Sequence, residues 1–160
     1  MSKKPRRKRR QPNYATTHNF QALEERRLLA NVAVGNNLDI VNGDTSSIAA
    51  LITDDGGDGV SLREAISAAN NTAGADGVTF DDSLSGETIL LNGTDLDIND
   101  SLIIDASALS TSITIDADDQ SRILNFTAST GDLTIDNLTI TGGSSAQGGG
   151  VFFDSSGTLT

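Results

Sequence analysis

The chain has 160 residues, of which 36% are apolar, 4% aromatic and 21% charged, and its formal net charge is −11. This allows one or two small domains with a modest core, while the lack of cysteine excludes a disulfide scaffold and a cysteine-ligated metal site. A chain with no tryptophan, one tyrosine and a single histidine (His18, in a polar segment) is poorly suited to base stacking and to most acid–base catalysis.

The charges are divided between a basic tail and an acidic body. Residues 1–30 contain nine bases and two acids, a net of +7, whereas residues 31–160 contain two bases and 20 acids, a net of −18. We expect residues 1–30 to be a mostly disordered export or targeting segment. The run Lys3–Arg10 also matches a nucleic-acid patch or nuclear signal, but the acidic body would repel nucleic acid, so we expect no such partner.

The tail has no apolar stretch of the roughly 7–15 residues that a secretory signal peptide needs. No stretch of the sequence approaches the ~18 apolar residues of a membrane-spanning helix, so we expect no transmembrane segment. Phe20–Ala30, FQALEERRLLA, resembles the LEPR-XLL-type N-terminal segment of planctomycete surface and extracellular proteins, with Glu25 where proline is usual. The resemblance implies a bacterial protein that is secreted or held at the cell surface or outer envelope.

Residues 31–59 form a polar lead-in in which Leu38–Val41 and Ile48–Ile52 are predicted as short strands. The segment Asp54–Gly59 must be a loop, because aspartate and glycine supply its turn conformations. Read as an EF-hand-type calcium loop from Asp54, it places Ala65 where a bidentate glutamate is needed. We therefore favour a solvated turn, with bound Ca²⁺ as the weaker alternative.

The clearest helix signal follows, at about residues 61–70. Ser61 and Glu64 have the spacing of a capping box, in which each side chain accepts from the other residue's backbone N–H. The apolar side chains that follow share one helix face: Leu62, Ala65, Ile66 and Ala69. A helix of nine residues is too short to stand alone in water, so we expect it to cap the end of a sheet.

From residue 77 onward the sequence predicts only short β segments separated by polar breaks. Their apolar residues recur in three series: Leu91, Ile113, Leu133, Leu159; Leu102, Leu124, Val151; and Leu96, Leu138. A shared period near 21 residues predicts a solenoid of stacked coils, with a parallel β-helix as the natural case. Residues 60–160 would then hold the helix and about three coils, and an antiparallel sandwich is the alternative.

The segment Val60–Asn70, VSLREAISAAN, resembles the CSLREAI-type motif, with Val60 in the place of the frequent cysteine. Together with five later segments, it resembles the start of right-handed parallel β-helix proteins of bacterial surfaces; these segments are Gly74–Phe80, Ile103–Asp105, Ser121–Leu124, Leu138–Gly143 and Gly148–Val151. These are the polymorphic-outer-membrane-protein-like and pectate-lyase-like repeat proteins. The resemblance covers about residues 55–160 and implies an all-β fold with the helix as its N-terminal lid.

The strand pattern runs to Thr160, which predicts an open end with unpaired strand edges. We expect the sequence to be a fragment, a truncated reading frame, or a protein that needs a partner at that end. Self-association through the open end is one such partnership.

Asp105, Asp116 and Asp136 each follow an isoleucine that ends a predicted strand. They would line a cation or sugar site or, as we favour, accept hydrogen bonds within turns. Lyase chemistry on acidic sugars needs a cationic group, and the body offers Arg63, interpreted as a solvated helix residue, and Arg122, interpreted as a charge flanking a strand. We therefore assign no catalytic, cofactor-binding or metal-binding residue.

The sequence thus predicts a non-enzymatic structural or adhesive β-helix protein, secreted or at the cell surface. Its expected partner is extracellular polysaccharide or the cell-envelope matrix. The alternative is the N-terminal part of a polysaccharide-active lyase- or hydrolase-like enzyme whose catalytic coils are absent from this sequence.

Overall fold

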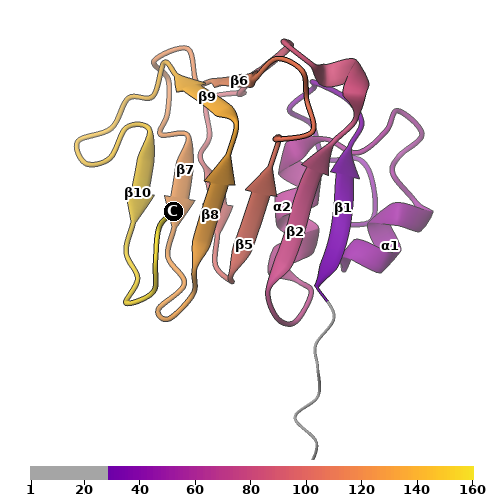
Figure 1. The fold of residues 1–160 in the computed structure, drawn as a ribbon, viewed down its shortest axis with the longest axis horizontal. Helices are drawn as coiled ribbons and strands as arrows, with labels where there is room; N and C mark the ends of the chain where they lie inside the picture. The colour runs from indigo at the N-terminus through magenta and orange to yellow at the C-terminus, as the bar shows by residue number, and fades with distance from the viewer. Residues whose placement is uncertain (1–28) are drawn as a thin grey trace, which may run out of the picture.

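The computed structural model describes residues 29–160 as mostly strands, arranged in three parallel sheets with few helices (Figure 1). The first sheet has the order β1 (Ala30–Val34), β2 (Asp76–Phe80), β5 (Leu102–Asp105), β8 (Leu133–Asp136). The second has the order β3 (Thr88–Leu90), β6 (Ile113–Asp116), β9 (Leu138–Thr141). The third has the order β4 (Leu96–Ile98), β7 (Leu124–Phe126), β10 (Val151–Phe153).

From β2 onward the chain visits the three sheets in turn. Each repeat contributes one strand to each sheet, as β2–β3–β4, then β5–β6–β7, then β8–β9–β10. After β10, Leu159 forms an isolated parallel bridge with Leu133 and so extends the first sheet beyond β8. Every strand pairing among the described residues is parallel. The expected all-β parallel, solenoid-like arrangement is confirmed at this level, and the antiparallel sandwich is wrong.

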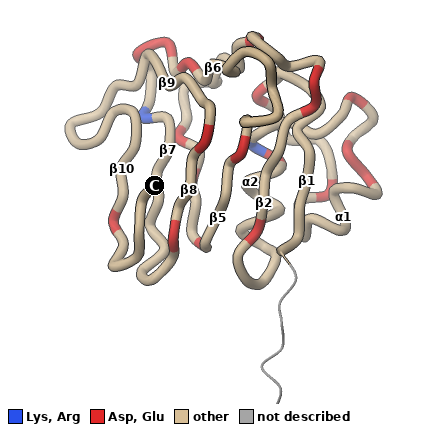
Figure 2. Tube along the Cα trace, viewed as in Figure 1, with Lys and Arg blue, Asp and Glu red and all other residues tan. Residues whose placement is uncertain are grey.

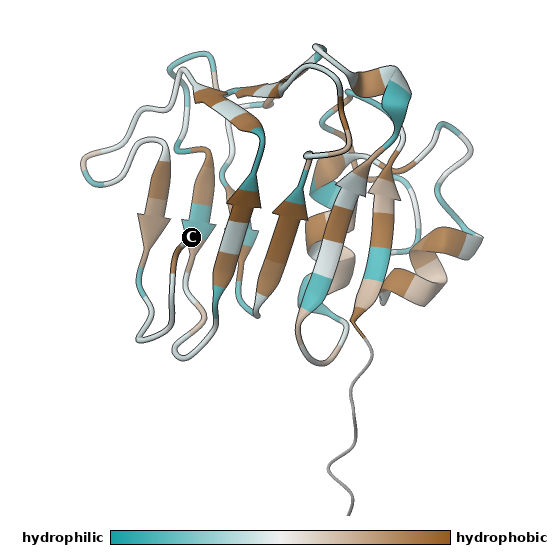
Figure 3. Ribbon diagram, in the orientation of Figure 1, coloured by the Kyte–Doolittle hydropathy of each residue, from teal (hydrophilic) through white to brown (hydrophobic). Residues whose placement is uncertain are grey.

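Parallel pairing in register places like side chains on top of one another in the core. The inward columns include Ile89–Ile115–Ile140 in the second sheet and Ile98–Phe126–Phe153 in the third. The rings of Phe126 and Phe153 are stacked, with centroids 4.9 Å apart. Side chains from all three sheets belong to one hydrophobic cluster, and brown and paler residues alternate along several strands in Figure 3. This alternation follows from the two-residue period of a strand.

The length of the repeat predicted from the sequence is wrong. Val78 pairs with Ile104 after 26 residues, Leu96 with Leu124 after 28, and Ile113 with Leu138 after 25. Most steps of the predicted period link strands of different sheets, such as Ile113 in β6 and Leu133 in β8, because each sheet contributes similar short apolar strands. Of the predicted pairings, Leu124 with Val151 and Leu133 with Leu159 are confirmed.

In the last repeat, a single residue connects β8 to β9. Asn137 separates β8 from β9 with a left-handed backbone (φ 56°), a conformation that asparagine tolerates better than most residues. Its Nδ2 donates to the carbonyl of Ala106 at 2.9 Å, and its Oδ1 accepts from the Ser112 hydroxyl at 2.8 Å. The corner is therefore fixed to the repeat beneath it.

Both strands predicted in the lead-in are wrong. Leu38–Val41 forms no regular element, and the segment predicted as strand Ile48–Ile52 lies in helix α1 (Ile48–Thr53). Ser47 caps this helix by accepting from the Ala50 N–H at 3.1 Å, and Ile48 and Leu51 are buried one turn apart. A short apolar run fits the period of a strand and the period of a helix, so its local sequence does not distinguish the two. Strand β1 was not predicted.

The predicted capping helix is confirmed as α2 (Leu62–Asn70), with both bonds of the capping box formed. It contacts α1, β1, β2 and β4 and so covers the β1 end of the stack, while a short 3₁₀ helix (Asp82–Leu84) follows β2. No helix within residues 29–160 is long and apolar enough to cross a membrane. The LEPR-XLL-like segment lies almost entirely outside the described residues, since only its end enters β1.

Candidate functional site

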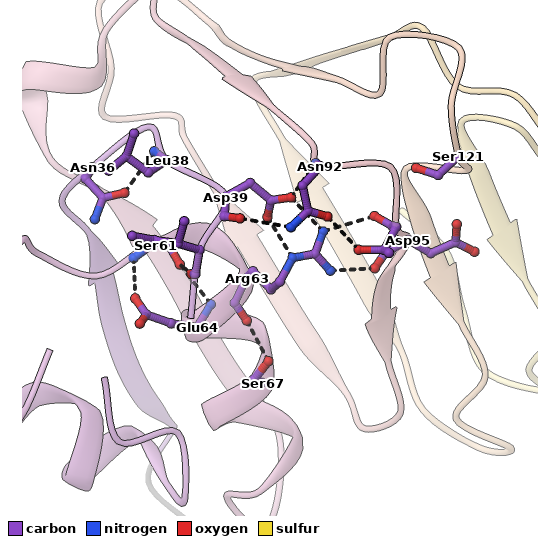
Figure 4. A network of polar contacts seen from close by, with 12 residues as sticks. Asn36, Leu38, Asp39, Ser61, Arg63, Glu64, Ser67, Asn92, Asp95 and Ser121 are labelled. Atoms are coloured by element: carbon purple, nitrogen blue, oxygen red, sulfur yellow. Dashed lines mark hydrogen bonds and ion pairs between the residues drawn. The ribbon is translucent and has the colours of Figure 1, made fainter. Parts of the chain in front are cut away.

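Arg63 of α2 is the centre of a polar network on the third-sheet side of the cap (Figure 4). Its Nε and Nη2 donate to Asp39 Oδ1 and Oδ2 at 2.7 and 2.9 Å, a bidentate ion pair in which the Asp39 side chain is 3% exposed. Its Nη1 and Nη2 also donate to the carbonyls of Asp95 and Thr94 at 2.8 and 3.0 Å. The interpretation of Arg63 as a solvated helix residue is therefore wrong.

Asp39 extends this network to the turn before β4. Its Oδ2 accepts from the Asn92 backbone N–H at 2.7 Å, and its carbonyl accepts from Asn92 Nδ2 at 3.1 Å. The polar lead-in, the capping helix and the first repeat are thus joined through one buried carboxylate. Sequence reasoning missed Asp39, because nothing in the local pattern pairs it with a residue 24 positions away.

Glu64, the neighbour of Arg63, is fully buried and has a second role besides the capping box. Its carboxylate accepts from the backbone N–H groups of Asn42 and Gly43, both at 2.7 Å, and of Ser61 at 2.9 Å. Burial alone would raise the pKa of Glu64, but these hydrogen bonds outweigh it and the pKa lies below its ordinary value. Glu64 therefore stays ionised and ties the lead-in to α2.

Arg122 precedes β7 and holds the loop between β9 and β10. Its Nε and Nη2 donate to the carbonyls of Gly148 and Gln147, both at 3.0 Å, and Nη2 also donates to the Ser145 hydroxyl at 3.1 Å. Arg122 flanks a strand as expected, but its side chain forms hydrogen bonds with this loop. Arg63 and Arg122 are the two basic residues within the described part of the chain (Figure 2).

The Arg122 guanidinium also lies against the outer face of the third sheet. It contacts the Phe152 ring, 4.6 Å from its centroid, and donates from Nη1 to Asn125 Oδ1 at 2.7 Å. Nη1 is 3.5 Å from Asp95 Oδ2, and Asn125 Nδ2 donates to Asp97 Oδ1 at 2.7 Å. The outward residues Asp97, Asn125 and Phe152 are in register on successive repeats.

A pocket of about 140 Å³ opens between α2 and β4, beside this network. Polar side chains from both elements and the preceding turn surround an apolar floor. Its lining consists of Arg63, Ile66, Ser67, Asn70, Asp95, Leu96 and Asp97.

The predicted loop Asp54–Gly59 has the hydrogen bonds of a turn. Asp54 Oδ1 accepts from the Gly56 N–H at 3.4 Å, Asp55 Oδ1 accepts from the Gly57 N–H at 2.9 Å, and the two glycines have φ of 78° and 91°. Within residues 29–160, aspartate and glutamate side chains nowhere gather in threes as a metal ion would require. The turn interpretation is confirmed.

The three predicted strand-end carboxylates do not form one column. Asp105 and Asp136 are paired in the first sheet, whereas Asp116 lies in the second. Asp105 accepts from the Ser107 N–H at 2.8 Å, and Asp116 from the Asp118 N–H at 2.9 Å, which confirms the turn role for both. Hydrogen bonds from the Ser107 hydroxyl and backbone N–H lower the pKa of Asp105.

Asp76 is a buried acid that the sequence analysis did not single out. The residue is 2% exposed, and its Oδ2 has no hydrogen-bond partner among the described residues. Burial raises the pKa of Asp76; a hydrogen bond from the backbone of Ala30 opposes this effect, and the charge of Asp100 adds to it.

Comparison with protein-family models, with curated proteins and with solved structures found no match to this chain. The class that its own fold defines is an all-β protein of stacked parallel strands with a helical cap at one end. The polar side chains of Asp39, Arg63 and Arg122 connect the lead-in, the cap and one loop to the stack.

Proposed function

We propose that this chain is the start of a right-handed parallel β-helix of the CSLREAI-type class and serves as a non-enzymatic structural and adhesive protein, secreted or at the cell surface. Its partner would be extracellular polysaccharide or the cell-envelope matrix. The observation that carries the proposal is the stack itself: three parallel sheets share one core, and α2 covers the β1 end.

Such a stack suits a surface role because the residues that form its core are not the residues that form its outer faces. The inward columns are aliphatic or aromatic, so each repeat adds rigidity without using its outward residues. The outward positions are mostly polar, as in the column Thr88–Thr114–Thr139 of the second sheet. A rigid, polar and acidic surface remains soluble and is available for contacts with a hydrated matrix.

The partners of Arg63 and Arg122 support the proposal that the protein is not an enzyme. Lyase chemistry on an acidic sugar needs a cationic group free to meet the substrate. Arg63 is paired with the buried Asp39, and Arg122 is bonded to the loop before β10, so neither offers an unengaged positive charge.

Fractionation of the native host, followed by N-terminal sequencing of the mature protein, tests this proposal. We expect the protein in the cell envelope or the medium, while a cytosolic marker protein stays behind. Recovery of the intact chain, with Met1, in the cytosol would contradict it. Incubation of the purified chain with acidic and neutral polysaccharides tests the alternative, since release of unsaturated or reducing ends would show an enzyme.

A further inference from the structure

We propose that the pocket between α2 and β4 binds one neutral sugar unit of an extracellular glycan. This inference rests on the proposed matrix-binding role and assigns it a place on the molecule. The pocket, of about 140 Å³, is small beside the roughly 300–1,000 Å³ of sites that hold drug-sized ligands, which favours a single small polyhydroxylated ring.

The pocket is held rigid by elements that the network fastens together. Ile66 and Leu96 are 2% and 1% exposed and form its floor. Asn70 joins the walls, because its Nδ2 donates to the Asp97 carbonyl at 2.8 Å and its Oδ1 accepts from the Asn99 N–H at 2.9 Å. A wall fixed before binding loses little conformational entropy when a ligand arrives.

Donors and acceptors in the pocket are only partly used by the protein. Arg63 directs four of its five N–H groups at Asp39 and at backbone carbonyls, which leaves one N–H of Nη1 without a partner within residues 29–160. Ser67 donates its hydroxyl hydrogen to the Arg63 carbonyl and keeps its lone pairs. Asp97 accepts from Asn125 at Oδ1, and Oδ2 has no partner in the same range.

This mixture of open donors and acceptors matches hydroxyl groups, since each hydroxyl both donates and accepts. The charges select against anionic sugars. Asp39 neutralises Arg63, and Arg122 Nη1 lies 3.5 Å from Asp95 Oδ2. Asp97 adds a negative charge that forms no ion pair within residues 29–160. A uronic acid would therefore be repelled, whereas a neutral ring would meet both kinds of partner.

The outward column also extends beyond the pocket. Asn125 and Phe152 follow Asp97 in register on the next two repeats. A glycan that leaves the pocket along the stack would meet an amide and then an aromatic ring, two groups that contact sugars through hydrogen bonds and apolar faces.

The test is titration of the full chain with cellohexaose, xylohexaose, mannohexaose and a galacturonate hexamer, followed by NMR chemical shifts. We expect at least one neutral hexamer to bind with a Kd of about 1 mM or tighter, and the galacturonate hexamer about tenfold more weakly or worse. Shifts should concentrate on α2 and β4.

Two variants locate the site. In Ser67→Leu the leucine side chain fills the pocket and should abolish binding, while its high helix propensity preserves α2. Asp97→Asn should weaken binding about tenfold. Thr53→Leu on α1 is the matched control, because Thr53 and Ser67 both donate to the carbonyl four residues before them. Thermal melts establish that each variant is folded.

Binding that survives Ser67→Leu would overturn the inference, as would the absence of any neutral-hexamer binding at about 10 mM. Neither result bears on the surface location that fractionation measures, so failure of this site and failure of the proposed function can be told apart.

Discussion

At the scale of single residues, Asp39 and Arg63 join three parts of the molecule that are distant in sequence. A buried ion pair is not by itself a large source of stability, because desolvation of both groups offsets their attraction. Removing one member is costly, however, since the other charge stays buried without its partner.

Asp39→Ala should therefore destabilise the protein by about 3 kcal/mol, because it removes the carboxylate partner of the Arg63 guanidinium and the acceptor of the Asn92 backbone N–H. Urea denaturation of the variant and the wild type measures this loss. A change below about 0.5 kcal/mol, the range of ordinary surface substitutions, would show that the pair is solvated.

Asp76 should make stability fall as pH rises. Its pKa is raised in the folded protein, so its carboxyl favours folding most below the ordinary value of 3.8, and this contribution is lost as pH rises through the folded pKa. The wild type should therefore lose stability relative to Asp76→Asn over this range. Unfolding free energies measured at several pH values test this, and parallel curves for the two proteins would refute it.

At the scale of secondary structure, α2 was predictable to within a residue, whereas β1 and α1 were not. The capping box and the apolar face of α2 are local signals, and both are formed in the structure. The strands after residue 77 were also predictable, because two-residue alternation is local. Helix α1 and strand β1 depend on packing against α2 and β2, which no local pattern contains.

The period of the repeat was beyond local reasoning for a related physical reason. Three sheets with equivalent apolar alternation give the same signal, so hydropathy alone cannot tell which sheet a strand joins. The same limit applies to the pocket, whose walls come from α2, β4 and the turn between β3 and β4.

Glu64→Gln should weaken the connection between α2 and the lead-in. The carboxylate accepts three backbone N–H groups, and an amide in its place turns one acceptor into a donor, at a cost of about 2 kcal/mol at pH 7. Because the folded pKa is lowered, the contribution of Glu64 is present above the ordinary value of 4.5 and is lost as pH falls through the folded pKa. The difference between wild type and variant should shrink accordingly in denaturation at acid pH, and a constant difference would contradict it.

At the scale of the whole molecule, burial of the core changes along the stack. The inward residues of β5, β6 and β7 are buried, whereas most of those in β8, β9 and β10 are only half-buried. The last repeat therefore contributes less hydrophobic stabilisation per residue than the one before it.

Phe126 and Phe153 provide a matched pair for this gradient, since they occupy the same inward column. Phe126→Ala should cost about 4 kcal/mol, because Phe126 is fully buried, and Phe153→Ala distinctly less. Chemical denaturation of both variants measures the difference. Equal losses would show that the two repeats are equally well packed.

The spacing of the registered strands has a consequence for engineering. Partner strands from β2 onward are separated by 25 to 31 residues, yet their columns remain aligned, so the corners absorb every change in length. Foreign peptides grafted into the longer corners, rather than into the one-residue corner at Asn137, should leave the columns aligned, and several of them could be displayed side by side at fixed intervals along one scaffold.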